Sequence, residues 1–105
     1  MAEVILVATM TVRREAIDEF RSFENQAAGI MAKHRGIIER AVVVDSGSGP
    51  LQEIHIVTFP SEQALAAYQA DDGLRKLARL REQSVIKTEI IRGEAGPDYR
   101  PEALA

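Results

Sequence analysis

The sequence of 105 residues contains no cysteine and no tryptophan. Without cysteine there can be no disulfides, thiolate metal sites, iron–sulfur clusters or cysteine nucleophiles. The two histidines, His34 and His55, are too few for a multi-histidine metal site within one chain. The sequence has no dinucleotide-binding fingerprint, and the glycine-containing loop at residues 47–49 is not followed by the lysine of a phosphate loop. We therefore expect no metal and no cofactor.

Positive charge and long apolar runs are scarce as well. Thirteen lysines and arginines stand against sixteen aspartates and glutamates, so a formal net charge of −3 leaves no basic field to attract nucleic acid. No run approaches the roughly 18 apolar residues of a membrane span. The apolar stretch at residues 4–8 is short and lacks a basic segment before it, which indicates a strand and not a signal peptide. We expect a cytoplasmic protein that binds neither nucleic acid nor membrane.

The residues that are present suit one folded domain. Hydrophobic residues make up 46% of the chain and charged residues 28%, which is close to the ordinary globular mixture. The length also matches a single domain. Periodicity ends after Gly93, so we expect the domain to comprise residues 1–93 and residues 94–105 to form a tail.

Strand and helix periodicities alternate along this domain. Short apolar runs predict four strands, at residues 3–10, 37–45, 52–59 and 84–92. Apolar residues at three- and four-residue spacing predict a helix over residues 13–33, ended by Gly36 as its cap, and a second helix that begins after Ser61 and is interrupted at 71–73. This order predicts an α+β fold of the ferredoxin-like βαββαβ kind. Its four-stranded antiparallel sheet would carry both helices on one face.

The predicted strands are apolar on both of their faces. Residues 4–8 and 41–44 are apolar at odd and even positions alike, whereas a sheet with one wet face should alternate. Two helices cover only one face, and a soluble monomer rarely exposes a large apolar patch on the other. We therefore predict a homodimer packed through the sheet face. Coverage by a different protein or by the chain's own tail is the rival explanation.

The element order and one short motif resemble a known superfamily. The motif is Phe59-Pro60-Ser61, followed by Ala64, Tyr68, Leu77, Leu80 and Arg81. Over residues 3–93 the chain resembles the dimeric α/β-barrel proteins, most closely a small family of uncharacterised bacterial domains with an F-P-S…L-R signature. It is more distantly similar to antibiotic-biosynthesis-type monooxygenases. The resemblance implies a dimeric α/β barrel with a ligand cavity at the dimer face, but the superfamily's chemistry varies. The Asn–Trp–His site of its haem-degrading branch cannot form without tryptophan.

His55 is the main candidate for chemistry. It lies mid-strand, two residues after Glu53 and therefore on the same face. The intervening residues form the more apolar set, so we expect Ile54, Ile56 and Thr58 to face the helices. Glu53, His55, Val57 and Phe59 would then face the dimer partner. An imidazole beside a carboxylate can act as a general base, with Glu53 as its catalytic neighbour. The alternative is a structural interface histidine bonded to Glu53.

Four further residues are candidates for ligand binding: Arg40, Phe59, Tyr68 and Arg81. The hairpin register decides whether Arg40 or Glu39 joins the face of His55, and both side chains also suit a solvated edge strand. Tyr68 lies on the inner stripe of the second helix, where it either reaches a cavity or packs in the core. Arg81 is a candidate because it belongs to the motif that resembles the superfamily. Its presence is explained equally well as a cation at a helix C-terminus.

Two functions fit these residues. One is a non-enzymatic dimeric barrel that binds a small, largely apolar molecule in its cavity. The alternative is a cofactor-independent monooxygenase or isomerase that uses His55 as general base, since such chemistry requires one base and an apolar, water-poor cavity.

Overall fold

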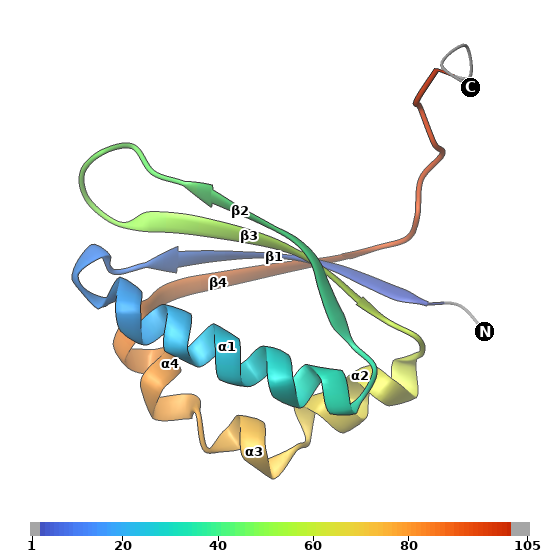
Figure 1. Ribbon diagram of the computed structural model, residues 1–105, viewed down its shortest axis with the longest axis horizontal. Helices are drawn as coiled ribbons and strands as arrows, with labels where there is room; N and C mark the ends of the chain where they lie inside the picture. Colours follow the sequence, from blue (N-terminus) through green and yellow to red (C-terminus); the bar gives the residue numbers. More distant parts are fainter. Residues whose placement is uncertain (1–2, 102–105) are drawn as a thin grey trace.

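The computed structural model describes residues 3–101. Its elements follow the chain in this order: β1 (Val4–Val12), the short 3-10 helix η1 (Arg14–Ala16), α1 (Ile17–Lys33), β2 (Ile37–Val44), β3 (Leu51–Phe59), α2 (Glu62–Gln69), α3 (Asp72–Arg75), α4 (Ala78–Ser84) and β4 (Val85–Gly93). All strand pairs are antiparallel, in the order β2-β3-β1-β4. The helices lie on one face of this sheet (Figure 1). The predicted α+β, ferredoxin-like βαββαβ fold is confirmed.

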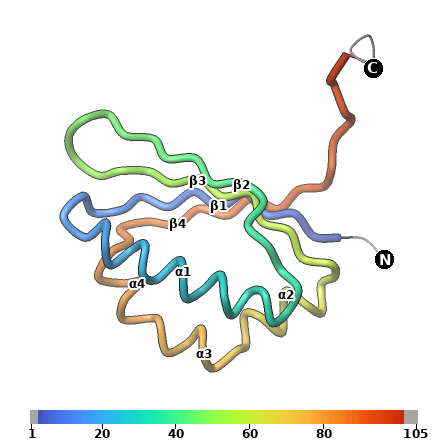
Figure 2. Tube along the Cα trace, viewed as in Figure 1, coloured from blue at the N-terminus to red at the C-terminus, as the bar shows by residue number. Residues whose placement is uncertain are grey.

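The second helical region consists of three short helices. Ser61 caps α2 by accepting a hydrogen bond from the Ala64 amide at 3.1 Å, as predicted. Asp71 caps α3 by accepting from the Gly73 amide at 2.7 Å. The predicted interruption at residues 71–73 is thus the start of a new short helix. In the trace the chain turns at each junction while it crosses below α1 (Figure 2).

The helices pack on the sheet through two apolar clusters. The first lies toward the start of α1 and contains Met10, Val12, Phe20, Phe23, Ala27 and Val85. The second lies toward its end and contains Val4, Met31, Val57, Phe59 and Leu65. Phe20 and Phe59 are fully buried, one in each cluster. Burial of such side chains is the main source of stability in a domain of this size.

The C-terminal end of α1 differs from its predicted cap. Arg35 has the positive φ of 61° that a C-terminal cap requires, a conformation that was expected at Gly36. Gly36 is required for space: an added Cβ would lie 2.4 Å from the Phe59 ring and 2.6 Å from Met31 Cγ. The glycine therefore allows the chain to pass directly against the second cluster.

β3 presents its odd-numbered residues to the helices. Val57 and Phe59 lie in the second cluster with residues of α1 and α2. The sequence prediction for this strand is wrong, because it turned Ile54, Ile56 and Thr58 toward the helices and Glu53, His55, Val57 and Phe59 away from them. Both sets are apolar enough to be buried. A period of two distinguishes the faces only when one of them is polar.

A β-bulge decides the hairpin register that the sequence left open. The pairing of β2 with β3 shifts between Ile38 and Arg40, which makes Glu39 the additional residue. Arg40 pairs with Ile56, and the carboxylate of Glu39 accepts a hydrogen bond from the Thr58 hydroxyl. Both charged side chains therefore belong to the face away from the helices. Neither joins the face of His55, contrary to the expectation that one of them would.

The sheet face away from the helices carries an apolar patch. Alternation along the paired strands places these residues on it: Ile5, Val7, Ile37, Val42, Val44, Ile54, Ile56 and Ile91. We call this set the open-face patch. Ile37, Val42, Val44 and Ile91 are exposed.

Among the described residues no helix is long and apolar enough to cross a membrane.

Candidate functional site

A cavity of about 320 Å³ lies between the sheet and the helices. Its apolar lining comes from all four strands and from α1, α2, α3 and α4, and includes Leu6, Ala8, Val57, Phe59, Leu65 and Leu74. Six polar residues complete it: Glu24, His55, Tyr68, Gln69, Arg81 and Thr88. Binding sites for small molecules combine an apolar lining with a few convergent polar groups in this way, and their volumes begin near 300 Å³.

The structure brings most of the predicted site residues together. His55, Phe59, Tyr68 and Arg81 all line the cavity, although they come from β3, α2 and α4. Glu53 does not line it, but its carboxylate is bonded to His55. Arg40 lies on the opposite face of the sheet, so the structure separates it from this cavity. The cavity lies between the sheet and the chain's own helices, and not at the face expected to pack against a dimer partner.

His55 lies between two carboxylates. Its Nε2 donates to Glu53 Oε1 at 2.8 Å, and its Nδ1 lies 3.2 Å from Glu24 Oε2. The His55 side chain is 5% exposed, and those of Glu24 and Glu53 are 16% and 13% exposed. The bond to Glu53 holds the imidazole ring so that Nδ1 points toward α1, and in this way it selects which nitrogen meets Glu24.

Glu24 is the site residue that sequence reasoning missed. Burial raises the pKa of its carboxyl above the ordinary value, and the negative charge of Glu53 raises it further. The positive charges of His55 and Arg81 oppose this rise, and that of His55 has the larger effect. Glu24 Oε2 is buried, and within residues 3–101 it has no hydrogen bond of acceptable geometry. Its position four residues after the buried Phe20 indicates the flank of the inner stripe, and this was the available signal.

Two other polar side chains border the same cavity. Burial raises the pKa of Tyr68 to about 12, so its hydroxyl stays protonated near neutral pH. The nearby charge of Glu24 adds to this rise, and that of Arg81 opposes it. The Tyr68 ring packs on Phe59 with 5.3 Å between ring centroids. Arg81 Nη2 donates to Thr88 Oγ1 at 2.6 Å. The cavity therefore combines an aromatic wall with a cation, a hydroxyl and a buried carboxyl.

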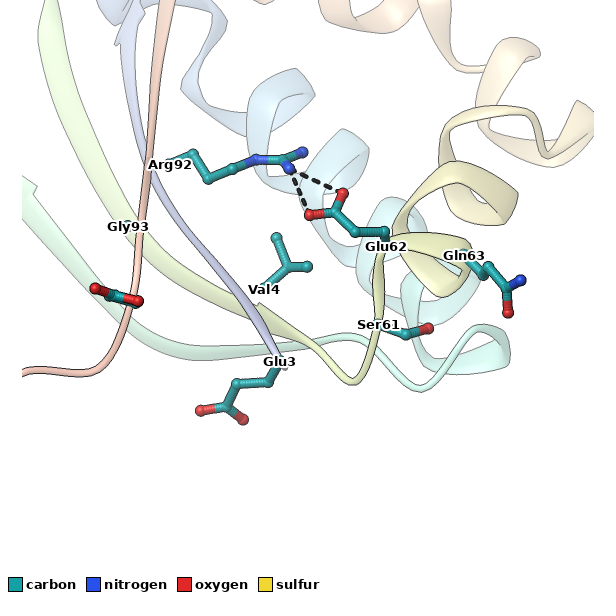
Figure 3. A pocket seen from close by; sticks show the side chains of 8 residues that line it. Glu3, Val4, Ser61, Glu62, Gln63, Arg92 and Gly93 are labelled. Carbon is teal, nitrogen blue, oxygen red and sulfur yellow. Dashed lines mark hydrogen bonds and ion pairs between the residues drawn. The ribbon is translucent and has the colours of Figure 1, made fainter. Parts of the chain in front are cut away.

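A second hollow, of about 450 Å³, lies where the start of α2 meets the ends of β1 and β4. Arg92, the cation in its lining, is bound by both oxygens of Glu62, at 2.8 and 2.6 Å (Figure 3). Glu3 and Gln63 point away from this ion pair (Figure 3). The hollow is larger but more open, and its cation is already paired. The cavity under the helices is therefore the better candidate site.

Within residues 3–101 no group of three or more histidine, cysteine, aspartate or glutamate side chains is arranged to hold a metal ion. Glu24, His55 and Glu53 are close together, but each imidazole nitrogen faces its own carboxylate. The three side chains therefore do not converge on one point.

Similarity to other proteins is evident in structure and not in sequence. No family model matches the chain, and no curated protein matches it either. SnoaB, a cofactor-independent oxygenase from Streptomyces nogalater, superposes with a TM-score of 0.74 at 20% identity, covering 96% of this chain and 100% of SnoaB. The chain has the fold of antibiotic-biosynthesis monooxygenase-like proteins.

Two further structures show the same fold. A protein of Nitrosomonas europaea that is classed with the antibiotic biosynthesis monooxygenases has a TM-score of 0.70 at 8% identity, over 89% of both chains. RPA0582 of Rhodopseudomonas palustris, a protein of unknown function, has a TM-score of 0.77 at 13% identity, over 92% of this chain and 85% of its own. The resemblance seen in the sequence is confirmed at the level of the fold. The narrower match to the F-P-S…L-R domains stays a prediction.

Proposed function

We propose that the chain binds a small, largely apolar molecule in the cavity between its sheet and its helices. The observation that carries this proposal is the cavity itself, which is apolar on most of its surface and has a few polar residues in its lining. It differs from the sequence hypothesis in place, because the ligand lies under the chain's own helices and not between two subunits.

The test is a titration with 2-naphthol, which joins an apolar ring system to one hydroxyl group. Ala8 lines the cavity floor on β1 opposite His55, so Ala8→Leu should fill the space and weaken binding at least about tenfold. Ala66 is exposed on α2 and outside the cavity, so Ala66→Leu is the matched control. Isothermal titration calorimetry should show binding to the wild type and to the control alone. Equal affinity of both variants would place the ligand elsewhere.

Acid–base catalysis in the same cavity is the second candidate, and the buried Glu24–His55–Glu53 arrangement favours it. A base in an apolar cavity can remove a proton from an activated carbon or a hydroxyl group. An isomerase would return that proton at another position. A monooxygenase without cofactor would use dioxygen to convert an activated CH₂ group into a carbonyl, and the second oxygen atom would leave as water with both substrate hydrogens.

Catalysis predicts turnover of a compound with an acidic C–H or O–H bond. We expect a screen of quinols, phenols and lactones, followed by chromatography and oxygen consumption, to reveal a product. His55→Ala breaks the Glu24–His55–Glu53 arrangement and should then lower the rate about 10²-fold or more, the usual scale of acid–base catalysis. If ligands raise the melting temperature but no product forms in any reaction, the protein is a binding protein only.

We further propose that the chain forms a homodimer through the open-face patch. Val42 and Val43 are neighbours on β2 with 43% and 49% exposure, but they lie on opposite faces of the sheet. Val42→Lys places a charge in the patch, whereas Val43→Lys places it on the helix side beside Glu53. Analytical ultracentrifugation should show a dimer for the wild type and for Val43→Lys, and a monomer for Val42→Lys. A monomeric wild type would remove the proposal.

A further inference from the structure

The two nitrogen atoms of His55 are not available to a ligand in the cavity. His55 Nε2 donates to Glu53 Oε1 at 2.8 Å, and Nδ1 lies 3.2 Å from Glu24 Oε2. Both ring nitrogens therefore face carboxylates of the protein, and only 5% of the His55 side chain is exposed. An imidazole has no other polar atom to offer. A ligand in the cavity would contact the carbon edge of this ring and not its basic nitrogen.

Glu24, unlike His55, has a polar group that can contact a ligand in the cavity. It lines the cavity, and its side chain is 16% exposed. Its Oε2 is buried and has no hydrogen bond of acceptable geometry to any residue in the described part of the chain, although His55 Nδ1 lies close to it. A buried acceptor without a partner costs free energy, and more when the group is charged. Rotation of a carboxyl about its last bond is soft, so one oxygen can stay with His55 while the other turns toward the cavity.

We propose that Glu24 is the group that contacts the ligand's polar end, and that the ligand is an apolar molecule with a hydroxyl donor, of the phenol or enol class. The inference rests on the proposed binding function. A ligand hydroxyl would donate to the Glu24 oxygen that turns toward the cavity, and the aromatic pair of Phe59 and Tyr68 would contact the apolar body. His55 and Glu53 are positioning residues, since they act on the ligand only through Glu24. In the catalytic version, Glu24 is the base that takes the hydroxyl proton.

The charged and titratable groups around Glu24 give the proposal a pH dependence. They are His55 and Glu53 on β3, Arg81 on α4 and Tyr68 on α2. Burial raises the pKa of Glu24, so the carboxyl is neutral at a higher pH than an exposed glutamate would be. Above that pKa the carboxylate accepts the ligand's hydrogen bond as a charged and therefore stronger acceptor. The preference for a hydroxyl-bearing ligand should consequently grow as the pH rises.

The experiment compares 2-naphthol with naphthalene, which has the same rings and no hydroxyl group. Affinities are measured between about pH 5 and pH 8, where phenolic hydroxyls remain protonated. For the wild type we expect 2-naphthol to bind about tenfold more tightly than naphthalene at the upper end, and a smaller ratio at the lower end. Glu24→Gln should remove the pH dependence of the ratio, and Glu24→Met should make the two ligands bind alike.

The positioning role of His55 has its own signature. Its charge lowers the pKa of Glu24, against the effect of burial. His55→Gln should therefore move the midpoint of the pH profile upward, a shift that a merely structural role would not produce. Circular dichroism and urea unfolding of each variant establish that it is folded before its affinities are compared. If His55→Gln does not fold, the two Glu24 variants still decide the proposal.

The outcomes separate this inference from the function on which it rests. Equal binding of naphthalene and 2-naphthol by the wild type overturns the role of Glu24 and leaves an apolar binding cavity. A pH-dependent preference that survives in Glu24→Met also overturns it, because another group then carries the effect. If neither compound binds the wild type, the proposed binding function fails, and this inference fails with it.

Discussion

Replacing Gly36 by alanine is expected to destabilise the protein by about 2–3 kcal/mol, the usual cost of forcing extra volume into a packed core. The new methyl group would lie 2.4 Å from the Phe59 ring and 2.6 Å from Met31 Cγ. Phe59 is fully buried and cannot retreat without opening the second cluster. Urea unfolding monitored by circular dichroism measures the difference in free energy.

Gly29→Ala is the matched control for this prediction. Gly29 is exposed in the middle of α1, and an added Cβ would meet nothing within 4 Å. Alanine favours a helix by about 1 kcal/mol over glycine, so this variant should be more stable than the wild type. The same substitution thus has opposite effects seven positions apart. If Gly36→Ala is as stable as the wild type, the close packing of the segment between α1 and β2 on Phe59 is incorrect.

The second large effect is expected from His55→Leu. Leucine would remove the imidazole that lies between the carboxylates of Glu24 and Glu53 and contacts both. Breaking a buried charged arrangement by removing one partner typically costs about 3 kcal/mol or more. We expect a loss of this size at neutral pH. Chemical denaturation at several pH values measures it.

Acidification should reduce that loss, and the sign follows from proton binding. Burial already raises the pKa of Glu24, and loss of the charge on His55 removes an effect that opposes the rise. A carboxyl whose pKa is higher in the folded than in the unfolded state binds more protons when folded, so stability increases as the pH falls. The gap between variant and wild type should therefore narrow toward pH 4 or so, near the ordinary carboxyl pKa.

His34→Leu provides the control for the histidine prediction. His34 is also bonded to a carboxylate, with Nε2 2.8 Å from Asp71 Oδ2, but the pair lies nearer the surface. Partly exposed pairs contribute about 1 kcal/mol or less. Similar losses in both variants would show that His55 is not in a special environment. The double substitution of His55 and Glu24 by leucine should recover part of the loss, because no unpaired charge remains on α1.

The fold could be read from the sequence because local signals agreed with one another. The strand and helix periods, the Ser61 cap and the interruption at residues 71–73 all indicated the same topology. The hairpin register could not be read, since the additional residue at Glu39 leaves no mark in the hydrophobic pattern. The sequence also did not show which residues of β3 face the helices, because both faces of the strand carry large apolar residues and both are covered in the proposed dimer.

The candidate site could be predicted only in part, because some of its residues are brought together only by the tertiary structure. His55 and Glu53 could be linked because they are two residues apart on one strand. Glu24 is distant in sequence, and on α1 it looks like one more polar residue between buried ones. Its proximity to His55 follows from the packing of α1 on β3, which is a property of the tertiary structure. Tyr68 and Arg81 were found through the motif, and the structure gives them a physical role at the cavity.

A crystal structure of the protein with bound 2-naphthol would show whether the ligand lies in the cavity and contacts Glu24. We expect the naphthalene rings to lie between the sheet and the helices against Phe59 and Tyr68, with the hydroxyl oxygen within hydrogen-bond distance of the Glu24 carboxyl. The ligand on the open-face patch, between two subunits and away from His55, would contradict this expectation.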